Sequence, residues 1–155
     1  MVTWLDEEEQ RAWRAYITAT VMLMRGLNKE MLDAHDLSMD DYAILAILSE
    51  QPDDRARFGD LAAILRVPKA HVTYRFKRLE ARGLVRREAC PSDARGAYAV
   101  LTPAGRNTIE AAAPDHVESV RRNLIDHLDR DQLLALGKAM RAVIEGHCST
   151  MPARH

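Results

Sequence analysis

Residues 60–106 read DLAAILRVPKAHVTYRFKRLEARGLVRREACPSDARGAYAVLTPAGR. An apolar segment at residues 61–66, followed by a Pro-containing turn, predicts a short helix. Residues 69–82 predict a second helix, because apolar side chains recur there at steps of four and three residues. We expect these side chains to form one buried stripe: Val72, Phe76 and Leu79.

Two strands are predicted after the second helix. Residues 84–89 and 97–102 flank a polar segment that contains Pro and Gly, which is typical of a β-hairpin. The short extended stretch Arg57-Phe58-Gly59 is a candidate for a minimal third strand. Helix, turn, helix, strand, turn and strand, in this order, predict a winged helix-turn-helix, which is a fold that binds double-stranded DNA.

The outer face of the second helix carries small, hydroxyl and basic side chains, which suit contacts with base edges in the major groove. At the hairpin tip, Arg95 is the candidate for insertion into the minor groove, and Asp93 is placed to pair with its guanidinium. Lys77 is expected to contact phosphate. Base contacts are expected from His71, Thr73 and Tyr74. The predicted DNA-binding residues are Lys69, Ala70, His71, Thr73, Tyr74, Lys77, Arg86, Asp93 and Arg95.

The charge of the chain is distributed unevenly. The 155 residues carry a formal net charge of −1, which by itself argues against nucleic-acid binding. Residues 55–106, however, hold 12 Lys/Arg and 4 Asp/Glu, a net charge of +8, and the remainder has a net charge of −9. A basic segment within an acidic chain favours a DNA-binding module. A solvated basic face with no partner is the alternative.

The N-terminal part predicts a single long helix over residues 6–34. Asp6 is a suitable N-cap, and Glu9 three residues later completes a capping-box pattern. One face of this helix is apolar, with Trp13, Ile17, Val21, Met24, Leu27 and Met31 at three- and four-residue steps. Such a helix is too long for a small domain to cover, so we expect a partner subunit to cover part of it.

Capping signals place the other helices. Ser38 is the predicted N-cap of an apolar helix, and Asp60 is the predicted cap of the helix over residues 61–66. Thr102 and Pro103 are the expected N-cap and first residue of another long helix. Pro114 should kink that helix. A last helix is expected to start at residues 129–131 and to end at Gly146, before a loose tail.

These elements predict a mainly α fold with a small β-wing. Residues 1–36 and 103–148 are expected to form dimerisation helices, and residues 37–102 a winged helix-turn-helix DNA-binding domain. Together they would make one intertwined domain. The length of the chain suits a single domain of ordinary size.

Three segments resemble the MarR family of bacterial transcription regulators: LEARGLVRR at residues 79–87, DARG at 93–96 and VLTPAG at 100–105. The resemblance implies a homodimer with intertwined first and last helices, and a pseudo-palindromic operator bound by two recognition helices. Its implied function is sequence-specific regulation of transcription, and we expect a repressor that a small ligand releases from DNA. The first acidic residue of the family's wing motif is replaced by Cys90 here, so its role does not carry over.

The resemblance also implies a small aromatic or anionic effector, bound where the dimerisation helices meet the winged domain. The matching positions are Trp13, Arg14, Tyr16, Ile17, Met39 and Tyr42. Aromatic walls and one guanidinium suit a carboxylate or phenolate. Trp13 and Tyr42 as simple core residues are the alternative. Urate is not predicted, because the acid that urate-responsive relatives use is replaced by Ala43.

Other functional classes find no support in the sequence. There is no metal-ligand spacing, no phosphate-binding loop and no nucleophile elbow, so no metal, no cofactor and no enzyme activity is expected. No apolar run approaches the length of a membrane span, and the acidic start at residues 6–9 is unlike a signal peptide, so we expect a cytoplasmic protein that does not bind membranes. Two alternatives remain open: redox regulation through Cys90, and a winged helix that binds protein rather than DNA.

Overall fold

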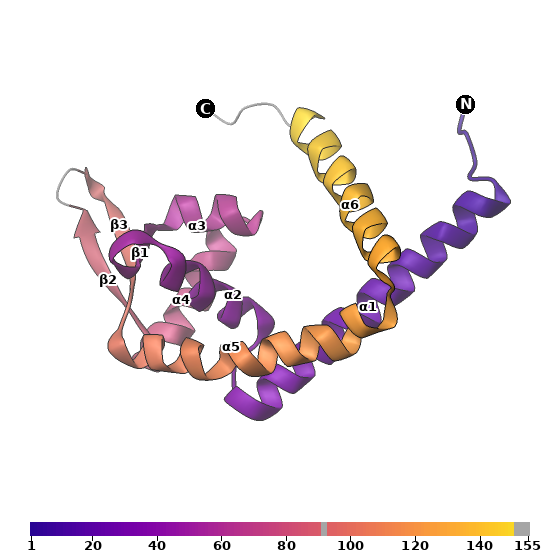
Figure 1. Cartoon of the computed structure of the whole chain (residues 1–155). Helices are drawn as coiled ribbons and strands as arrows, with labels where there is room; N and C mark the ends of the chain where they lie inside the picture. Colours follow the sequence, from indigo (N-terminus) through magenta and orange to yellow (C-terminus); the bar gives the residue numbers. More distant parts are fainter. Residues whose placement is uncertain (91–92, 151–155) are drawn as a thin grey trace. The chain divides into compact units, whose positions relative to one another are not determined.

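The computed structural model describes residues 1–90 and 93–150, with side chains described for residues 1–90 and 96–147 (Figure 1). The chain forms two compact units, Met1–Ser119 and Val120–His155. Helices predominate, and the strands form one small sheet, so the predicted fold class is confirmed. The elements are α1 (Glu7–His35), α2 (Met39–Glu50), η1 (Pro52–Asp54), β1 (Arg55–Arg57), α3 (Phe58–Leu65), α4 (Lys69–Ala81), β2 (Val85–Cys90), β3 (Asp93–Leu101), α5 (Pro103–Asn123), η2 (Ile125–His127) and α6 (Arg130–Thr150).

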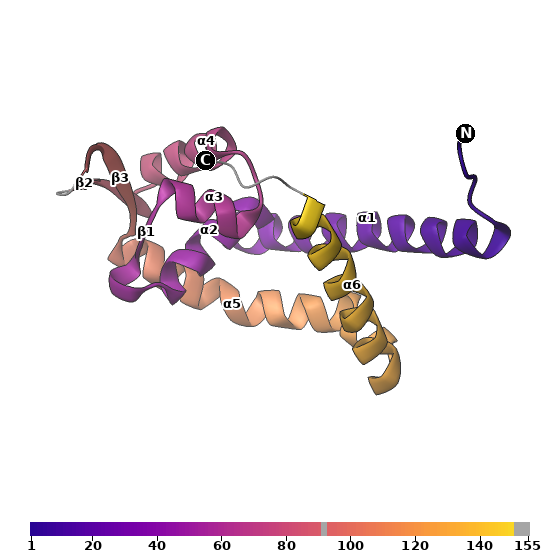
Figure 2. The same cartoon turned by 90° about the horizontal axis from the view of Figure 1, so that it is seen from above.

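The long helix α1 begins with the predicted capping box. The Asp6 side chain accepts hydrogen bonds from the backbone N–H groups of Glu8 and Glu9 at 2.8 and 2.9 Å, and the Glu9 carboxylate accepts from the Asp6 N–H. The N-terminal half of α1 extends away from the other elements of the first unit (Figure 2). Within α1, only Leu27 and Met31 are buried. Most of its predicted apolar stripe is therefore uncovered.

The winged module comprises α2, β1, α3, α4, β2 and β3. Its sheet has the strand order β1-β3-β2, and both pairings are antiparallel. The predicted stripe of α4 is confirmed, because Val72, Phe76 and Leu79 are all fully buried. The Phe76 ring packs edge-on against Phe58, with 4.7 Å between the ring centroids. This core fixes which face of α4 points outward.

Two boundaries in the winged module differ from the prediction. Helix α3 begins at Phe58, so the predicted cap at Asp60 is wrong. The predicted minimal third strand is present as β1, but it covers Arg55–Arg57 instead of residues 57–59. The Phe58 ring is buried in the core, and the helix starts at this residue. Asp60 therefore lies in the first turn of α3, where the helix dipole favours negative charge. The hairpin is also longer than predicted, because pairing continues to Cys90↔Asp93.

The second compact unit contains the end of α5, η2 and α6. The predicted start of α6 is confirmed, since Asp129 accepts from the Gln132 N–H and the Gln132 side chain accepts from the Asp129 N–H. The predicted end at Gly146 is wrong: α6 continues to Thr150. One glycine inside a helix costs only about 1 kcal/mol relative to alanine, which the remaining turns can offset. Helix α5 is continuous through Pro114, and the predicted tail at residues 151–155 lies outside the described residues.

Gly105 lies where α5 closely approaches Leu84, in the turn that joins α4 to β2. Its N–H donates to the Thr102 hydroxyl at 3.0 Å, as the predicted N-cap requires. A Cβ at Gly105 would lie 2.0 Å from the Leu84 carbonyl oxygen and 2.7 Å from the Leu101 side chain. We expect Gly105→Ala to lower the free energy of unfolding by about 1–3 kcal/mol, because backbone must move to relieve the clash.

Urea denaturation followed by circular dichroism measures this loss. Gly59→Ala is the matched control, because a Cβ at Gly59 meets nothing within 4 Å. The urea concentration at the unfolding midpoint of Gly59→Ala should equal that of the wild type or lie slightly above it. Equal midpoints for the two variants would show that the contact at Gly105 has no energetic consequence.

Candidate nucleic-acid interface

Helix α4 presents an outer face composed of basic, hydroxyl, aromatic and small side chains. Lys69, Ala70, Tyr74 and Lys77 are exposed, and His71 and Thr73 are half-buried. The Thr73 hydroxyl donates to the Lys69 carbonyl within the helix at 3.0 Å. These six residues are predicted DNA contacts, and the structure brings them to one helix. Neighbouring cations and hydroxyls on a convex helical face match what the major groove accepts.

The inner edge of α4 is joined to the start of α2 by a group of polar side chains. Asp40 Oδ2 lies 2.8 Å from Arg75 Nη2 and 3.2 Å from His71 Nε2. Arg75 Nη1 also donates to the Ser38 hydroxyl at 3.3 Å and lies 3.9 Å from the buried Asp41 carboxylate. The sequence analysis missed this cluster, because more than thirty positions separate its two halves and neither half has a motif of its own.

The C-terminal end of α4 is tied to the turn between α1 and α2. Arg82 Nη1 donates to the Asp36 carbonyl at 2.7 Å, and Arg82 Nη2 lies 3.4 Å from the Asp36 carboxylate. Asp36 has a left-handed backbone, with φ of 53°. The same turn reaches α5 through His35 Nε2 and Asp115 Oδ2, which are 2.7 Å apart. Arg82 thus ties the C-terminal end of α4 to the residue after α1, and His35 ties the end of α1 to α5.

The sheet carries cations on both faces. Arg86 is exposed and pairs with Glu88, whereas the Arg87 guanidinium stacks over the Phe58 ring at 4.8 Å. On the outer face, the guanidiniums of two further arginines lie over the Tyr98 ring, at 5.3 and 5.6 Å from its centroid. These are Arg55 and Arg57, which the sequence analysis did not single out.

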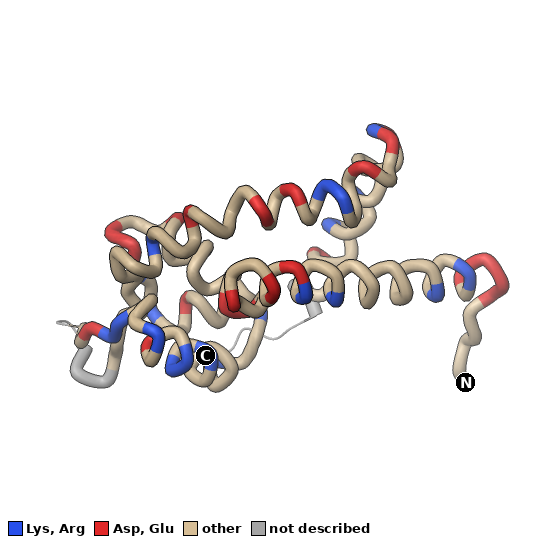
Figure 3. The backbone as a smooth tube through the Cα atoms, turned by 90° about the horizontal axis from the view of Figure 1, so that it is seen from below, with Lys and Arg blue, Asp and Glu red and all other residues tan. Residues whose placement is uncertain are grey.

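The tip of the wing carries two further predicted contacts. The backbones of Asp93 and Arg95 belong to β3, but their side chains lie outside the described residues. Their predicted pairing therefore stays a prediction. Figure 3 shows Lys and Arg gathered at the end of the first unit that carries the winged module, with acidic residues at the start of α1.

Cys90 is the last residue of β2, paired with Asp93 at the turn end of the hairpin, and is buried, with 4% of its surface exposed. Arg57 Nη2 donates to its sulfur at 3.3 Å. A guanidinium beside a thiol favours the thiolate, whereas burial in apolar surroundings opposes it. The structure therefore gives the redox alternative no exposed thiol at this position.

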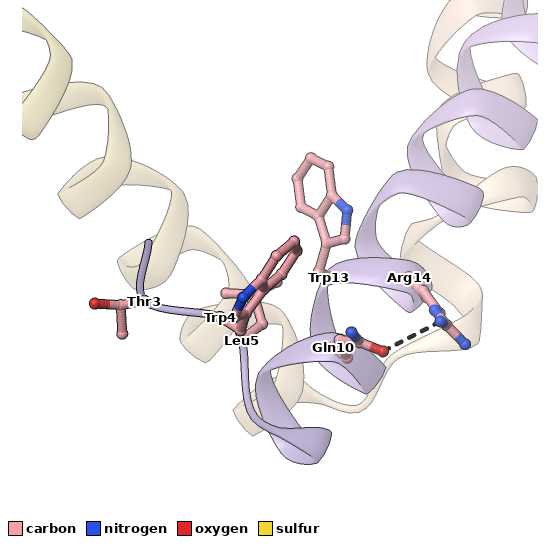
Figure 4. Close-up of a pocket in the computed structure, with 6 residues that line it drawn as sticks. All are labelled: Thr3, Trp4, Leu5, Gln10, Trp13 and Arg14. Carbon is pink, nitrogen blue, oxygen red and sulfur yellow. Dashed lines mark hydrogen bonds between the residues drawn. The ribbon is translucent and has the colours of Figure 1, made fainter. Parts of the chain in front are cut away.

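The predicted effector residues fall into two groups. Trp13 and Arg14 line an open pocket of about 430 Å³ together with Thr3, Trp4, Leu5 and Gln10 (Figure 4). Arg14 Nη2 donates to the Gln10 side chain at 3.1 Å. Tyr16 is adjacent, with its ring centroid 6.1 Å from that of Trp13. Ile17 belongs to the exposed apolar stripe of α1.

Met39 and Tyr42 form the second group and do not line this pocket. Both pack against the core of the winged module. The Tyr42 ring stacks on His116 of α5, with 4.4 Å between centroids. Burial, with a smaller contribution from Glu50, raises the pKa of Tyr42, and burial lowers the pKa of His116. The core interpretation thus fits Tyr42, whereas Trp13 is more than half exposed.

The described residues form neither a metal site nor a membrane span. Over residues 1–90 and 93–150 no group of three or more His, Cys, Asp or Glu side chains is arranged to hold a metal ion. Within the same ranges, no helix has the length and apolar character needed to cross a membrane.

The comparisons with known proteins agree with this geometry. A family profile described as MarR family matches residues 35–96. AbsC, a MarR family transcriptional regulator from Streptomyces coelicolor, is 41% identical with a TM-score of 0.91, over 96% of this chain and 100% of AbsC. Sco3205 from the same organism, a MarR family regulator whose structure was solved in complex with DNA, is 37% identical with a TM-score of 0.93, over 99% of this chain and 94% of Sco3205.

More distant structures share the fold. BpsR from Bordetella bronchiseptica is 21% identical with a TM-score of 0.74, over 86% of this chain and 98% of BpsR. A search of curated proteins gives no match. The outward face of α4, the basic wing and the identity to AbsC and Sco3205 over nearly the full chain lead to one conclusion. This chain belongs to the MarR family of DNA-binding transcriptional regulators.

Proposed function

We propose that the protein is a homodimeric repressor that binds a pseudo-palindromic operator through α4 and the wing. The observation that carries this proposal is that one face of α4 is buried in the core and the opposite face is exposed. Val72, Phe76 and Leu79 lock one face into the core, while Lys69, Tyr74 and Lys77 are exposed on the other. The core thereby presents a rigid, basic helical face, which suits insertion into the major groove.

The long helices support the homodimer. Along α1 between residues 13 and 24, six apolar side chains expose 39–69% of their surface: Trp13, Tyr16, Ile17, Val21, Met22 and Met24. In the second unit, α6 likewise exposes Leu134, Val143 and Ile144 by about half. Contiguous apolar surface of this extent marks an interface. A second copy of the chain would place a second α4 for the other half of the operator.

Lys77 tests the DNA-binding face. We expect Lys77→Ala to weaken binding to every duplex by a similar factor and to lower the slope of log affinity against log salt by about 1, because one phosphate contact is lost. Fluorescence anisotropy with labelled duplex across a salt series measures both quantities. Lys29→Ala, which removes an exposed lysine of α1 paired with Asp33, should leave them unchanged. Wild-type slope in Lys77→Ala would remove this residue from the interface.

An effector is the second part of the proposal. The pocket at the start of α1 combines two indole rings with the Arg14 guanidinium, which suits a small aromatic carboxylate. BpsR, which shares the fold, is described as having its DNA binding regulated by 6-hydroxynicotinic acid. A ligand that favours one spacing of the two α4 helices would change operator affinity.

Tryptophan fluorescence reports on this pocket, because Trp4 and Trp13 are the two tryptophans of the chain and both line it. Titration with a panel of aromatic carboxylates should identify one that changes the emission. Arg14→Ala should weaken that ligand roughly tenfold or more, because a charge-assisted hydrogen bond is lost. Arg11→Ala, on the same helix and outside the pocket, is the control. If Arg14→Ala binds the ligand like the wild type, the guanidinium is not part of the site.

A further inference from the structure

Three residues form the junction between α1 and α2: Asp36, Leu37 and Ser38. Asp36 has a left-handed backbone, which aspartate tolerates better than most residues do, and its N–H donates to the Leu32 carbonyl at 3.0 Å. Leu37 is fully buried, and Ser38 is the N-cap of α2. The junction therefore holds a defined shape, and the direction in which α1 leaves the winged module depends on it.

Two arginines of α4 donate hydrogen bonds to this junction. Arg82 Nη1 donates to the Asp36 carbonyl oxygen at 2.7 Å, and Arg75 Nη1 donates to the Ser38 hydroxyl at 3.3 Å. The two arginines are seven positions apart, close to two helical turns, so both side chains leave α4 on the same face. The junction is thus held against α4 at two points.

The junction also joins the long helices to the winged module. His35, the last residue of α1, has its Nε2 2.7 Å from Asp115 Oδ2 of α5. The N–H of Met39, the first residue of α2, donates to the Asn28 side chain of α1 at 3.0 Å. In the proposed homodimer the long helices pair and the winged modules read DNA, so this junction is the joint between the two parts.

The length of α1 makes the angle at this joint important. Helix α1 has 29 residues, which is about 44 Å of helix. A rotation of about 5° at one end displaces the other end by about 4 Å, more than the rise of about 3.4 Å for one base pair. A dimer whose joint is loose would therefore not distinguish half-site spacings that differ by one base pair.

We propose that Arg82 is a positioning residue, which holds the angle between α1 and α4 and so sets the half-site spacing that the homodimer accepts. The inference rests on the proposed function, a homodimer that reads two half-sites, and adds the residue that fixes the distance between its two copies of α4. The backbone carbonyl of Asp36 is the acceptor that matters, because the hydrogen bond from a guanidinium is charge-assisted. The Asp36 carboxylate lies 3.4 Å from Arg82 Nη2 but is 89% exposed, and exposed ion pairs contribute little.

Duplexes with altered half-site spacing test the proposal. An operator is first selected from randomised duplexes with the full chain, and its half-sites are then moved together or apart by single base pairs. Each base pair shifts one half-site by about 3.4 Å along the DNA axis and about 35° around it. The wild type should lose affinity about tenfold or more at each altered spacing, because one α4 then loses its base contacts.

Arg82→Ala should bind the selected and the altered spacings within about threefold of each other, because the freed joint lets the second α4 follow the displaced half-site. Its affinity for the selected spacing should fall about threefold to tenfold, since only a fraction of the dimers has that spacing at any moment. Its affinity for a duplex with a single half-site, and its midpoint of urea denaturation, should equal those of the wild type. Arg82→Lys should recover part of the discrimination, because an ammonium donates to the same carbonyl.

Arg78→Ala is the matched control. Arg78 is an exposed arginine of the same helix, one turn before Arg82, and makes neither of the two contacts with the junction. This variant should discriminate between spacings as the wild type does, because the loss of a positive charge weakens binding to all duplexes alike. Asp36→Asn should keep the discrimination too, since asparagine tolerates the left-handed backbone and retains the carbonyl.

Each contrary result has a distinct meaning. If Arg82→Ala discriminates between spacings like the wild type, the proposal is overturned and the proposed function stands. The same holds if Arg82→Ala weakens every duplex equally, including the single half-site, and lowers the salt slope, since Arg82 would then be a phosphate contact. If the wild type itself accepts all spacings equally, or enriches no sequence, both the proposal and the proposed two-site operator are wrong.

Discussion

Replacing Ile17 by Glu should turn the proposed homodimer into monomers and reduce operator binding to the level of non-specific DNA. Ile17 lies on α1 with 39% of its surface exposed, in the middle of the uncovered apolar stripe. In the dimer, a carboxylate at this position would be buried without a partner, at a cost of several kcal/mol in each of two symmetry-related copies. A monomer keeps one α4 and loses half of the operator contacts. Affinity should therefore fall about 10³-fold or more.

Sedimentation equilibrium measures the mass of the variant, and anisotropy measures its affinity for operator. Ala19→Glu is the control, because it introduces the same carboxylate at an exposed position of the same helix about 160° away from Ile17. That control should remain dimeric and bind operator like the wild type. If the Ile17→Glu variant is dimeric and binds operator like the wild type, the dimer does not use this face of α1.

Replacing Phe76 by Ala should remove about 3–5 kcal/mol from the free energy of unfolding. The ring is fully buried, stacks edge-on against Phe58, and carries the Arg87 guanidinium 5.8 Å from its centroid. The deletion leaves a cavity beneath the recognition helix. Since small domains are stable by only about 5–15 kcal/mol, this loss removes a large fraction of the total stability.

Urea denaturation followed by circular dichroism gives the loss. Phe76→Leu fills most of the space and should lose clearly less. Tyr74→Ala, on the same helix but 61% exposed, should change stability by no more than about 0.5 kcal/mol while weakening DNA binding. An unfolding free energy of Phe76→Ala close to that of the wild type would contradict the assignment of Phe76 to the core.

Local signals made much of this fold predictable. The capping box of Asp6 and Glu9 and the cap at Ser38 each depend on residues within one helical turn, and both were confirmed. The buried face of α4 followed from the spacing of three apolar residues, and it placed the predicted DNA contacts on one surface. Where a feature depends on neighbours in the sequence, the pattern of residues determines it.

The features that could not be predicted depend on contacts between distant segments. Burial of Phe58 moved the start of α3, because the ring packs on Phe76, eighteen positions away. The pairing of Asp40 with His71 and Arg75 has no local signature either, since aspartate early in α2 is fully explained by the helix dipole. His71 was predicted as a base contact from its exposed face alone, and only the fold reveals which of its nitrogens faces α2.

The central claim is that two copies of α4, held by one homodimer, occupy two half-sites of an operator. The most direct test of this claim uses an operator selected from a pool of randomised duplexes. Hydroxyl-radical footprinting maps the protected bases, and sedimentation gives the mass of the complex. We predict two chains per duplex and two protected segments whose centres lie about 10 base pairs apart, one turn of DNA. A complex with one chain per duplex, or a single continuous protected segment without that spacing, would contradict the claim.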